Sequence, residues 1–158
     1  MNCIDISFLK TMIAANGLLR LTICGNSMFP TLKDGDQIDI IMQKEYCIGD
    51  VLVFASKNNT IVAHRLLKIN NKLYCKGDNS FLLEHVDVEN VLGRVKGFKR
   101  GSRYFLPIAF DNEMVLMSYR IAKAFRMCGY DKKKILQNPL YTEYLKKLTV
   151  LCSAQKGD

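Results

Sequence analysis

A serine in a turn and a histidine in a strand-like segment are the residues of this chain best suited to covalent chemistry. Ser27 follows Gly25 and Asn26 and precedes Pro30, which cannot continue a sheet ladder or a helix interior. We therefore expect the Ser27 hydroxyl to be presented rather than buried. His64, one of two histidines, can accept the proton of such a hydroxyl and so make it a nucleophile.

Each of these two residues also has a structural interpretation. Serine beside glycine and asparagine commonly caps backbone amides within a turn, which would leave Ser27 without a chemical role. His64 lies in the alternating segment 60–66, where a histidine can simply form hydrogen bonds within a strand. The other histidine, His85, is interpreted as a surface or loop residue. Taken singly, Ser27 and His64 favour the structural interpretation, and only their combination with further motifs favours catalysis.

Four short motifs follow one another along the chain. They are GNSMFPTL at 25–32 with DGD at 34–36, GDVLVF at 49–54, HRL at 64–66, and KGDN at 76–79 followed by LGRV at 92–95. Together they resemble the signal peptidase I-like serine peptidases of the S24/S26 superfamily, within it the branch that uses histidine instead of lysine. That branch covers endoplasmic-reticulum, archaeal and some bacterial signal peptidases. The resemblance spans roughly residues 17 to 100.

The resemblance implies a serine endopeptidase that works through an acyl-enzyme. Ser27 would be the nucleophile and His64 the general base and then the general acid, with the Ser27 backbone amide contributing to an oxyanion hole. As the acid that orients the imidazole, Asp78 ranks first, Glu84 second and Asp87 third. The resemblance thus implies a Ser–His dyad or triad, and we expect neither a cofactor nor a metal ion.

The same resemblance implies the kind of substrate. Met28 and Phe29 would line an apolar wall that selects small side chains near the cut. The substrate would be a peptide or a precursor protein, processed as a leader or signal peptide is processed.

Arg65 cannot act as the base in place of His64, because a guanidinium stays protonated.

Two other functions fit parts of the pattern. A self-cleaving repressor-type domain has similar motifs, but it would need a lysine base and an N-terminal helix-turn-helix, for which the sixteen residues before the sheet leave no room. A catalytically inactive member that binds peptides or a partner is the second alternative. It would keep affinity for peptides without forming an acyl adduct.

Composition is typical of one globular domain with a real core. The 158 residues carry a net charge of +8, which favours acidic peptides, anionic lipid headgroups or nucleic acids as partners. No nucleic-acid motif accompanies this charge, so we expect no specific nucleic-acid binding. The six cysteines contain no Cys-x-x-Cys pair, which argues against a zinc site and favours a reducing, cytoplasmic compartment.

Apolar periodicity predicts a mainly β fold with helices at both ends. A short helix over 8–16 should stop at Asn16-Gly17, and its charges and length exclude a membrane span or a signal peptide. An antiparallel, partly closed barrel or pair of sheets should follow as the catalytic domain, residues 1–106. Its predicted strands are 18–24, 37–42, 50–55, 60–69, 72–76 and 91–98.

The last third of the chain, residues 107–158, is predicted to be a helical extension. One amphipathic helix should cover 113–126 and a second should follow Pro139. We expect these helices to cover one face of the sheet. The alternative is a basic element that associates with a membrane surface or docks a partner, for which Lys123 and Arg126 are suited.

Overall fold

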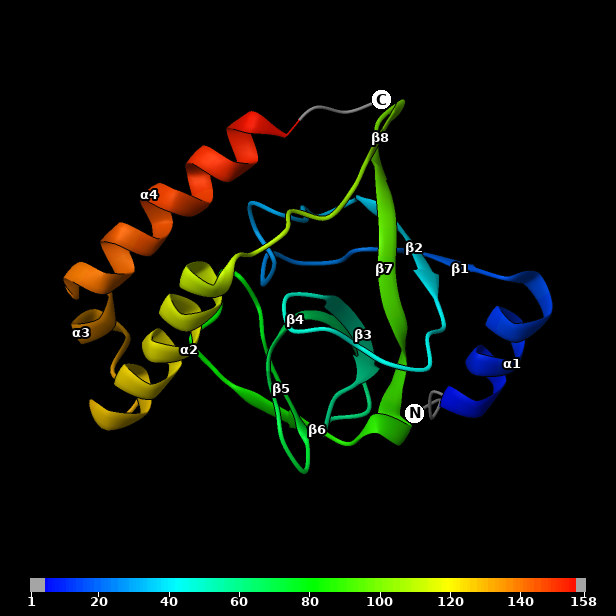
Figure 1. Cartoon of the computed structure of the whole chain (residues 1–158), viewed down its shortest axis with the longest axis horizontal. Coiled ribbons are helices and arrows are strands. Elements are labelled where there is room, and N and C mark those ends of the chain that lie inside the picture. The colour runs from blue at the N-terminus through cyan, green and yellow to red at the C-terminus, as the bar shows by residue number, and fades with distance from the viewer. Residues whose placement is uncertain (1–4, 156–158) are drawn as a thin grey trace.

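The computed structural model describes residues 5–155, and within them eight strands form one antiparallel sheet. The order is β1-β2-β7-β3-β4-β5-β6, with β8 paired to β7 (Figure 1). The strands are β1 (Leu19–Thr22), β2 (Gln37–Ile41), β3 (Val51–Ala55), β4 (Ile61–Ile69), β5 (Leu73–Lys76), β6 (Glu84–Val86), β7 (Val91–Arg100) and β8 (Arg103–Phe105). No pairing joins β1 to β6 among these residues, so the sheet is open. The predicted mainly antiparallel β fold with helices at both ends is confirmed.

Strand β3 shows why the sheet is covered on both faces. It is buried at four consecutive positions rather than at alternate ones. Val51 and Val53 belong to one apolar cluster, whereas Leu52 and Phe54 belong to another. Because successive side chains of a strand point to opposite faces, the two clusters lie on opposite sides of the sheet.

Two short strands were not predicted. Strand β6 has only three residues and contains Glu84 and His85, so it shows no apolar alternation. Strand β8 also has three residues and returns along β7 through a tight turn at Gly101, which has a positive φ of 61°. Strands this short carry too few positions for a period of two to be recognised.

Helix α1 (Ile6–Asn16) ends where the sequence predicts. Asp5 caps its first turn by accepting a hydrogen bond from the Phe8 amide, and Gly17 adopts a left-handed φ of 74° at its end. Its buried residue Ile13 packs into the cluster that contains Val51 and Val53. Within residues 5–155 no helix is both long and apolar enough to cross a membrane.

Three helices follow the sheet and lie on the side opposite α1 (Figure 1). They are α2 (Asn112–Met127), α3 (Lys132–Leu136) and α4 (Pro139–Ala154). Asp111, Asp131 and Asn138 cap their N-termini. The short helix α3 was not predicted, because five residues with three lysines show no amphipathic period. Helix α2 contacts β4 and β5 directly. The division at residues 106 and 107 stays a prediction.

The cysteines of the described residues are free thiols. They are Cys24, Cys47, Cys75, Cys128 and Cys152, and Cys3 lies outside these residues. Burial raises the pKa of the Cys75 thiol to about 12, so it stays protonated and packs as a small apolar side chain.

Candidate active site

Ser27 lies in the turn that follows β1, and its side chain is exposed as predicted. Gly25 opens this turn with a φ of 92°, a conformation that favours glycine. The Phe29 amide donates a hydrogen bond to the Asn26 carbonyl (3.1 Å) and closes the turn. From a distant loop, the Asn79 amide donates to the Ser27 carbonyl (2.8 Å). The serine is therefore held by its backbone while its hydroxyl stays accessible.

His64 lies on β4 and faces Ser27. Its side chain is largely buried, and its Nε2 atom lies 3.2 Å from Ser27 Oγ. The Phe54 ring meets the imidazole edge-on, with the ring centroids 6.0 Å apart. This packing limits how far the imidazole can turn away from the serine.

Glu84, the first residue of β6, completes a chain of contacts. One of its carboxylate oxygens forms a hydrogen bond with His64 Nδ1. Because a carboxylate only accepts, Nδ1–H donates to Glu84 and Nε2 of the neutral ring is left to accept the Ser27 proton. The three side chains thus form one chain of contacts from Ser27 Oγ to Glu84, an arrangement that can supply a nucleophile, a base and an acid that orients the base.

Asp78, ranked first as the orienting acid, forms neither a hydrogen bond nor an ion pair with His64. It is fully buried and forms a bidentate ion pair with Arg65, from Nε to Oδ1 (2.9 Å) and from Nη2 to Oδ2 (2.7 Å). The Thr31 hydroxyl donates to Asp78 Oδ2 as well (2.6 Å). The structure therefore brings Glu84, and not Asp78, to His64, and the Asp78 carboxylate is paired with a buried cation.

Asp87, ranked third, lies on the surface beyond β6. It pairs with Lys72 at 3.0 Å, and no hydrogen bond joins it to His64 in the described part of the chain. The structure thus separates the three candidate acids into one beside the histidine, one in a buried ion pair and one on the surface.

Arg65 is the residue whose importance the sequence analysis missed. Its Nη1 atom donates to the carbonyls of Gly49 and Ile108, both at 2.8 Å, and its guanidinium stacks on the Phe110 ring at 3.7 Å from the centroid. It thereby ties β4 to the segment that leads into α2. A signal was available, since an arginine in an apolar strand is rarely buried without an acidic partner, and Asp78 offers one.

The segment 76–78 connects the site to the C-terminal helices. The Tyr144 hydroxyl on α4 donates to the Asp78 carbonyl (3.0 Å). Lys76 is buried, donates to the Gly77 carbonyl (2.9 Å) and lies over the Tyr144 ring. Burial lowers the pKa of Lys76 to about 8. Its ammonium has no hydrogen bond to Ser27 among the described residues, whereas His64 Nε2 lies within hydrogen-bond distance of Ser27 Oγ.

Gly77 lies close to both the Ser27 backbone and the His64 side chain. A Cβ atom there would be 2.5 Å from the Ser27 carbonyl oxygen and 3.1 Å from His64 Nε2. Only glycine allows this close approach of the two loops.

Two cavities meet at Ser27. One, of about 480 Å³, extends beneath α1 and is lined by Met28, Ala63 and Leu9 among others. The other, of about 530 Å³, extends toward the C-terminal helices. Phe29 lines neither cavity; its ring is exposed and lies 5.8 Å from the Lys33 ammonium. Of the two residues predicted to line the substrate wall, the structure brings only Met28 to a cavity beside Ser27.

The described residues contain no group of three or more His, Cys, Asp or Glu side chains that could hold a metal ion. The family model described as Peptidase S24-like matches residues 4–96, more than half of the chain, and this span includes Ser27, His64 and Glu84. No curated protein sequence matches the chain.

Proposed function

Because the chain belongs to the Peptidase S24-like family and has a serine peptidase-type fold, we propose that it is a serine endopeptidase with a Ser27–His64–Glu84 triad. The observation that carries this proposal is the continuous chain of contacts from Ser27 Oγ through the imidazole to Glu84. The presence of histidine at the position of the base supports a likeness to the histidine-using signal peptidases rather than to members with a Ser–Lys dyad.

The proposed reaction has two steps. The Ser27 oxygen attacks the scissile carbonyl carbon while its proton passes to His64 Nε2, and His64 then gives that proton to the leaving amine. Water next attacks the acyl-enzyme, again with His64 as the base, and frees Ser27 and the new carboxyl terminus. The Ser27 amide donates no hydrogen bond to the described part of the chain, so it is available to the oxyanion.

The sheet offers an edge to which a substrate strand can add. Ile61–Ile69 (β4) pairs with β3 from Ile61 onward, but with β5 only from Arg65 onward. The outer edge of residues 61–64 therefore has no strand partner among the described residues. An extended peptide could pair there, with a side chain in the cavity beneath α1 and its scissile carbonyl against Ser27.

The cavity beneath α1 supports the choice of substrate. Its walls are mostly apolar, and the buried side chains of Met28 and Ala63 line it together with Ser27. We infer that small apolar side chains next to the cut are preferred and that the natural substrate is a leader or signal-type segment of a precursor. The alternative of an inactive peptide-binding module uses the same cavity without the chemistry.

Peptide-library digestion followed by mass spectrometry tests this proposal. Wild type should cut at sites with a small residue next to the scissile bond, and Ser27→Ala should make none of these cuts. Equal cutting by both proteins would contradict the assignment of Ser27. Incubation of the protein alone, followed by its intact mass, separates cleavage of other chains from self-cleavage.

A further inference from the structure

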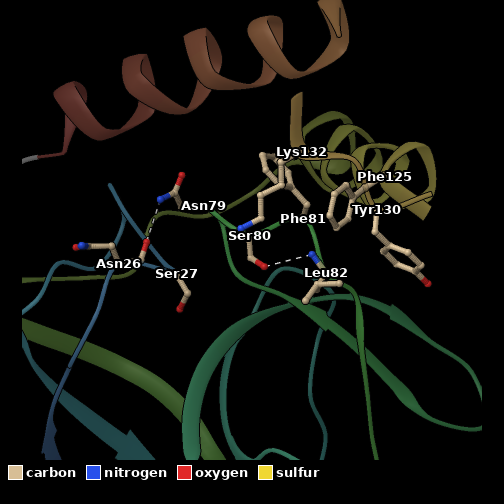
Figure 2. A pocket seen from close by; sticks show the side chains of 9 residues that line it. All are labelled: Asn26, Ser27, Asn79, Ser80, Phe81, Leu82, Phe125, Tyr130 and Lys132. Atoms are coloured by element: carbon tan, nitrogen blue, oxygen red, sulfur yellow. Dashed lines mark hydrogen bonds between the residues drawn. The ribbon is translucent and has the colours of Figure 1, made fainter. Parts of the chain in front are cut away.

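The second cavity beside Ser27 involves residues outside the family match. Figure 2 shows Ser27 and Asn26 at one end and, toward the other, Phe125 in the last turn of α2 and Tyr130 just beyond that helix. Lys132, the first residue of α3, also lines it. The family match ends at residue 96, so the C-terminal helices give this side of the site features that the catalytic core does not contain.

This cavity does not end at α2. A neighbouring cavity of about 580 Å³ shares with it the residues Phe81, Leu82, Phe125 and Tyr130. We call the two together the helix groove. It leads from Ser27 past the loop 79–82 and along α2, and its floor is apolar and aromatic.

The rim of the helix groove is basic. Lys123 and Arg126 on α2 and Lys132 on α3 line it, and all three are exposed. None of them forms an ion pair within residues 5–155. No acidic residue is among the lining residues; Asp131, next to Lys132 in the chain, accepts hydrogen bonds from the Lys133 and Lys134 amides, and Glu84, next to His85 of the groove, binds His64. The groove therefore combines apolar contact surface with cations that lack acidic partners.

We propose that the helix groove binds one flank of the substrate, and that this flank is an acidic peptide segment with interspersed apolar or aromatic residues. The groove and the cavity beneath α1 share only Ser27 among their lining residues. A peptide whose scissile bond lies at Ser27 can thus send one flank into each. That the bound molecule is a substrate rests on the proposed function. The acidic and apolar chemistry of its flank rests on the positive charge of the groove and on the continuity of the groove with Ser27.

Binding to the Ser27→Ala protein tests the proposal without turnover. The probe is a fluorescent peptide with an alanine-rich centre and a flank of Asp, Glu, Leu and Phe, made with the flank at either end. Of these two peptides, the one that binds more tightly is used. Its affinity for the double variant Arg126→Glu/Lys132→Glu should be about tenfold lower. The control is the double variant Lys44→Glu/Lys57→Glu, which changes the net charge by the same amount at exposed positions that line none of the described cavities. It should change the affinity by less than about twofold.

Two further measurements exclude a folding artefact. The two groove substitutions should change helix stability in opposite directions. Arg126→Glu places a negative charge in the last turn of α2, where the helix dipole disfavours it, and Lys132→Glu places one at the start of α3, where the dipole favours it. A peptide with Lys in place of Asp and Glu should bind the charge-reversed protein more tightly than it binds the parent. Tyr130→Asn removes a ring from the groove at a left-handed position that asparagine tolerates, and it should also weaken binding.

Equal affinity of the acidic peptide for the groove variant and the control variant would overturn the groove assignment. So would equal affinity of the acidic and the lysine-substituted peptides for the parent protein. The proposed function fails separately: if Ser27 does not react with a serine-directed probe while charge-dependent binding persists, the groove remains and the peptidase activity does not.

Discussion

At the residue scale, the carboxylates of Glu84 and Asp78 have different surroundings. The side chain of Glu84 is 31% exposed and forms a hydrogen bond with the imidazole, whereas that of Asp78 is 0% exposed and is matched by Arg65. A carboxylate beside a histidine can favour the correct tautomer and stabilise the imidazolium. A carboxylate in a buried ion pair instead links the structural elements that carry the two charges.

This difference predicts opposite results for two isosteric substitutions. Glu84→Gln should leave the protein folded but slow acylation of Ser27 by roughly 10²–10⁴-fold, because the amide no longer fixes the imidazole. Asp78→Asn should lower the free energy of unfolding by about 3–5 kcal/mol, because Arg65 would remain as an uncompensated buried charge. Urea unfolding and single-turnover labelling measure both effects. A stable, inactive Asp78→Asn protein beside an active Glu84→Gln protein would restore Asp78 as the orienting acid.

Gly77 provides a second residue-scale prediction. In Gly77→Ala the new Cβ would clash with the Ser27 carbonyl oxygen and crowd His64 Nε2. We expect overpacking to cost about 1–3 kcal/mol of stability and misalignment to slow acylation by about 10²-fold. Gly129→Ala, at a position with open space around it but a left-handed φ, serves as a control for backbone strain alone. Equal acylation rates for both variants would argue against a fixed Ser27–His64 geometry.

Lys76 gives a prediction about pH. Burial lowers its pKa from 10.5 to about 8, so between these values the unfolded state binds more protons and the free energy of unfolding rises with pH. Lys76→Met should lack this rise. It should also be about 2 kcal/mol more stable than wild type at pH 7, after allowing for the lost bond to the Gly77 carbonyl. Urea titrations from pH 7 to 11, with exposed Lys96→Met as the control, measure this; a variant less stable than wild type throughout would contradict it.

At the element scale, the C-terminal helices take part in building the site. Arg65 donates to the Ile108 carbonyl, and Tyr144 on α4 donates to the Asp78 carbonyl. The Asn79 amide, one residue further along, holds the Ser27 carbonyl. A continuous set of hydrogen bonds therefore leads from α4 to the backbone of the serine.

Tyr144→Phe should weaken this connection. It leaves a buried carbonyl without its donor, so we expect a loss of about 1–2 kcal/mol in the free energy of unfolding. Acylation should slow as well, because the loop 77–79 is less firmly held. The control is Tyr141→Phe on the same helix, whose hydroxyl has no hydrogen bond among the described residues. Indistinguishable stabilities for the two variants would mean that the helices contribute apolar packing only.

The elements also show what the sequence could predict. Clear apolar periods predicted the longer strands and helices α1, α2 and α4, and Gly17 predicted the end of α1. The structure confirms these elements. The three-residue strands and α3 lack such periods. The position of Glu84 depends on the pairing of β6 with β5, in which Glu84 lies opposite Cys75. Spacing along the chain could not show that Glu84 would reach His64 while Asp78 pairs with Arg65.

At the scale of the whole molecule, the family match and the site geometry come from overlapping parts of the chain. The match to residues 4–96 contains the serine, the histidine and the glutamate, and the helices beyond it add a basic groove. Part of the positive charge of the chain, that of Lys123, Arg126 and Lys132, therefore lines the groove that begins at Ser27, while the net charge of +8 has a general effect on solubility. The compartment and any contact with a membrane surface stay predictions.

The most direct test of the central claim is the intact mass of the protein after incubation with a small-residue peptidyl phosphonate, which reacts with an activated serine. We predict a single adduct on wild type that maps to Ser27, none on Ser27→Ala or His64→Ala, and slower formation on Glu84→Gln. Circular dichroism and urea unfolding should show all three variants to be folded. Absence of an adduct on folded wild type, or an adduct that persists in Ser27→Ala, would contradict the triad.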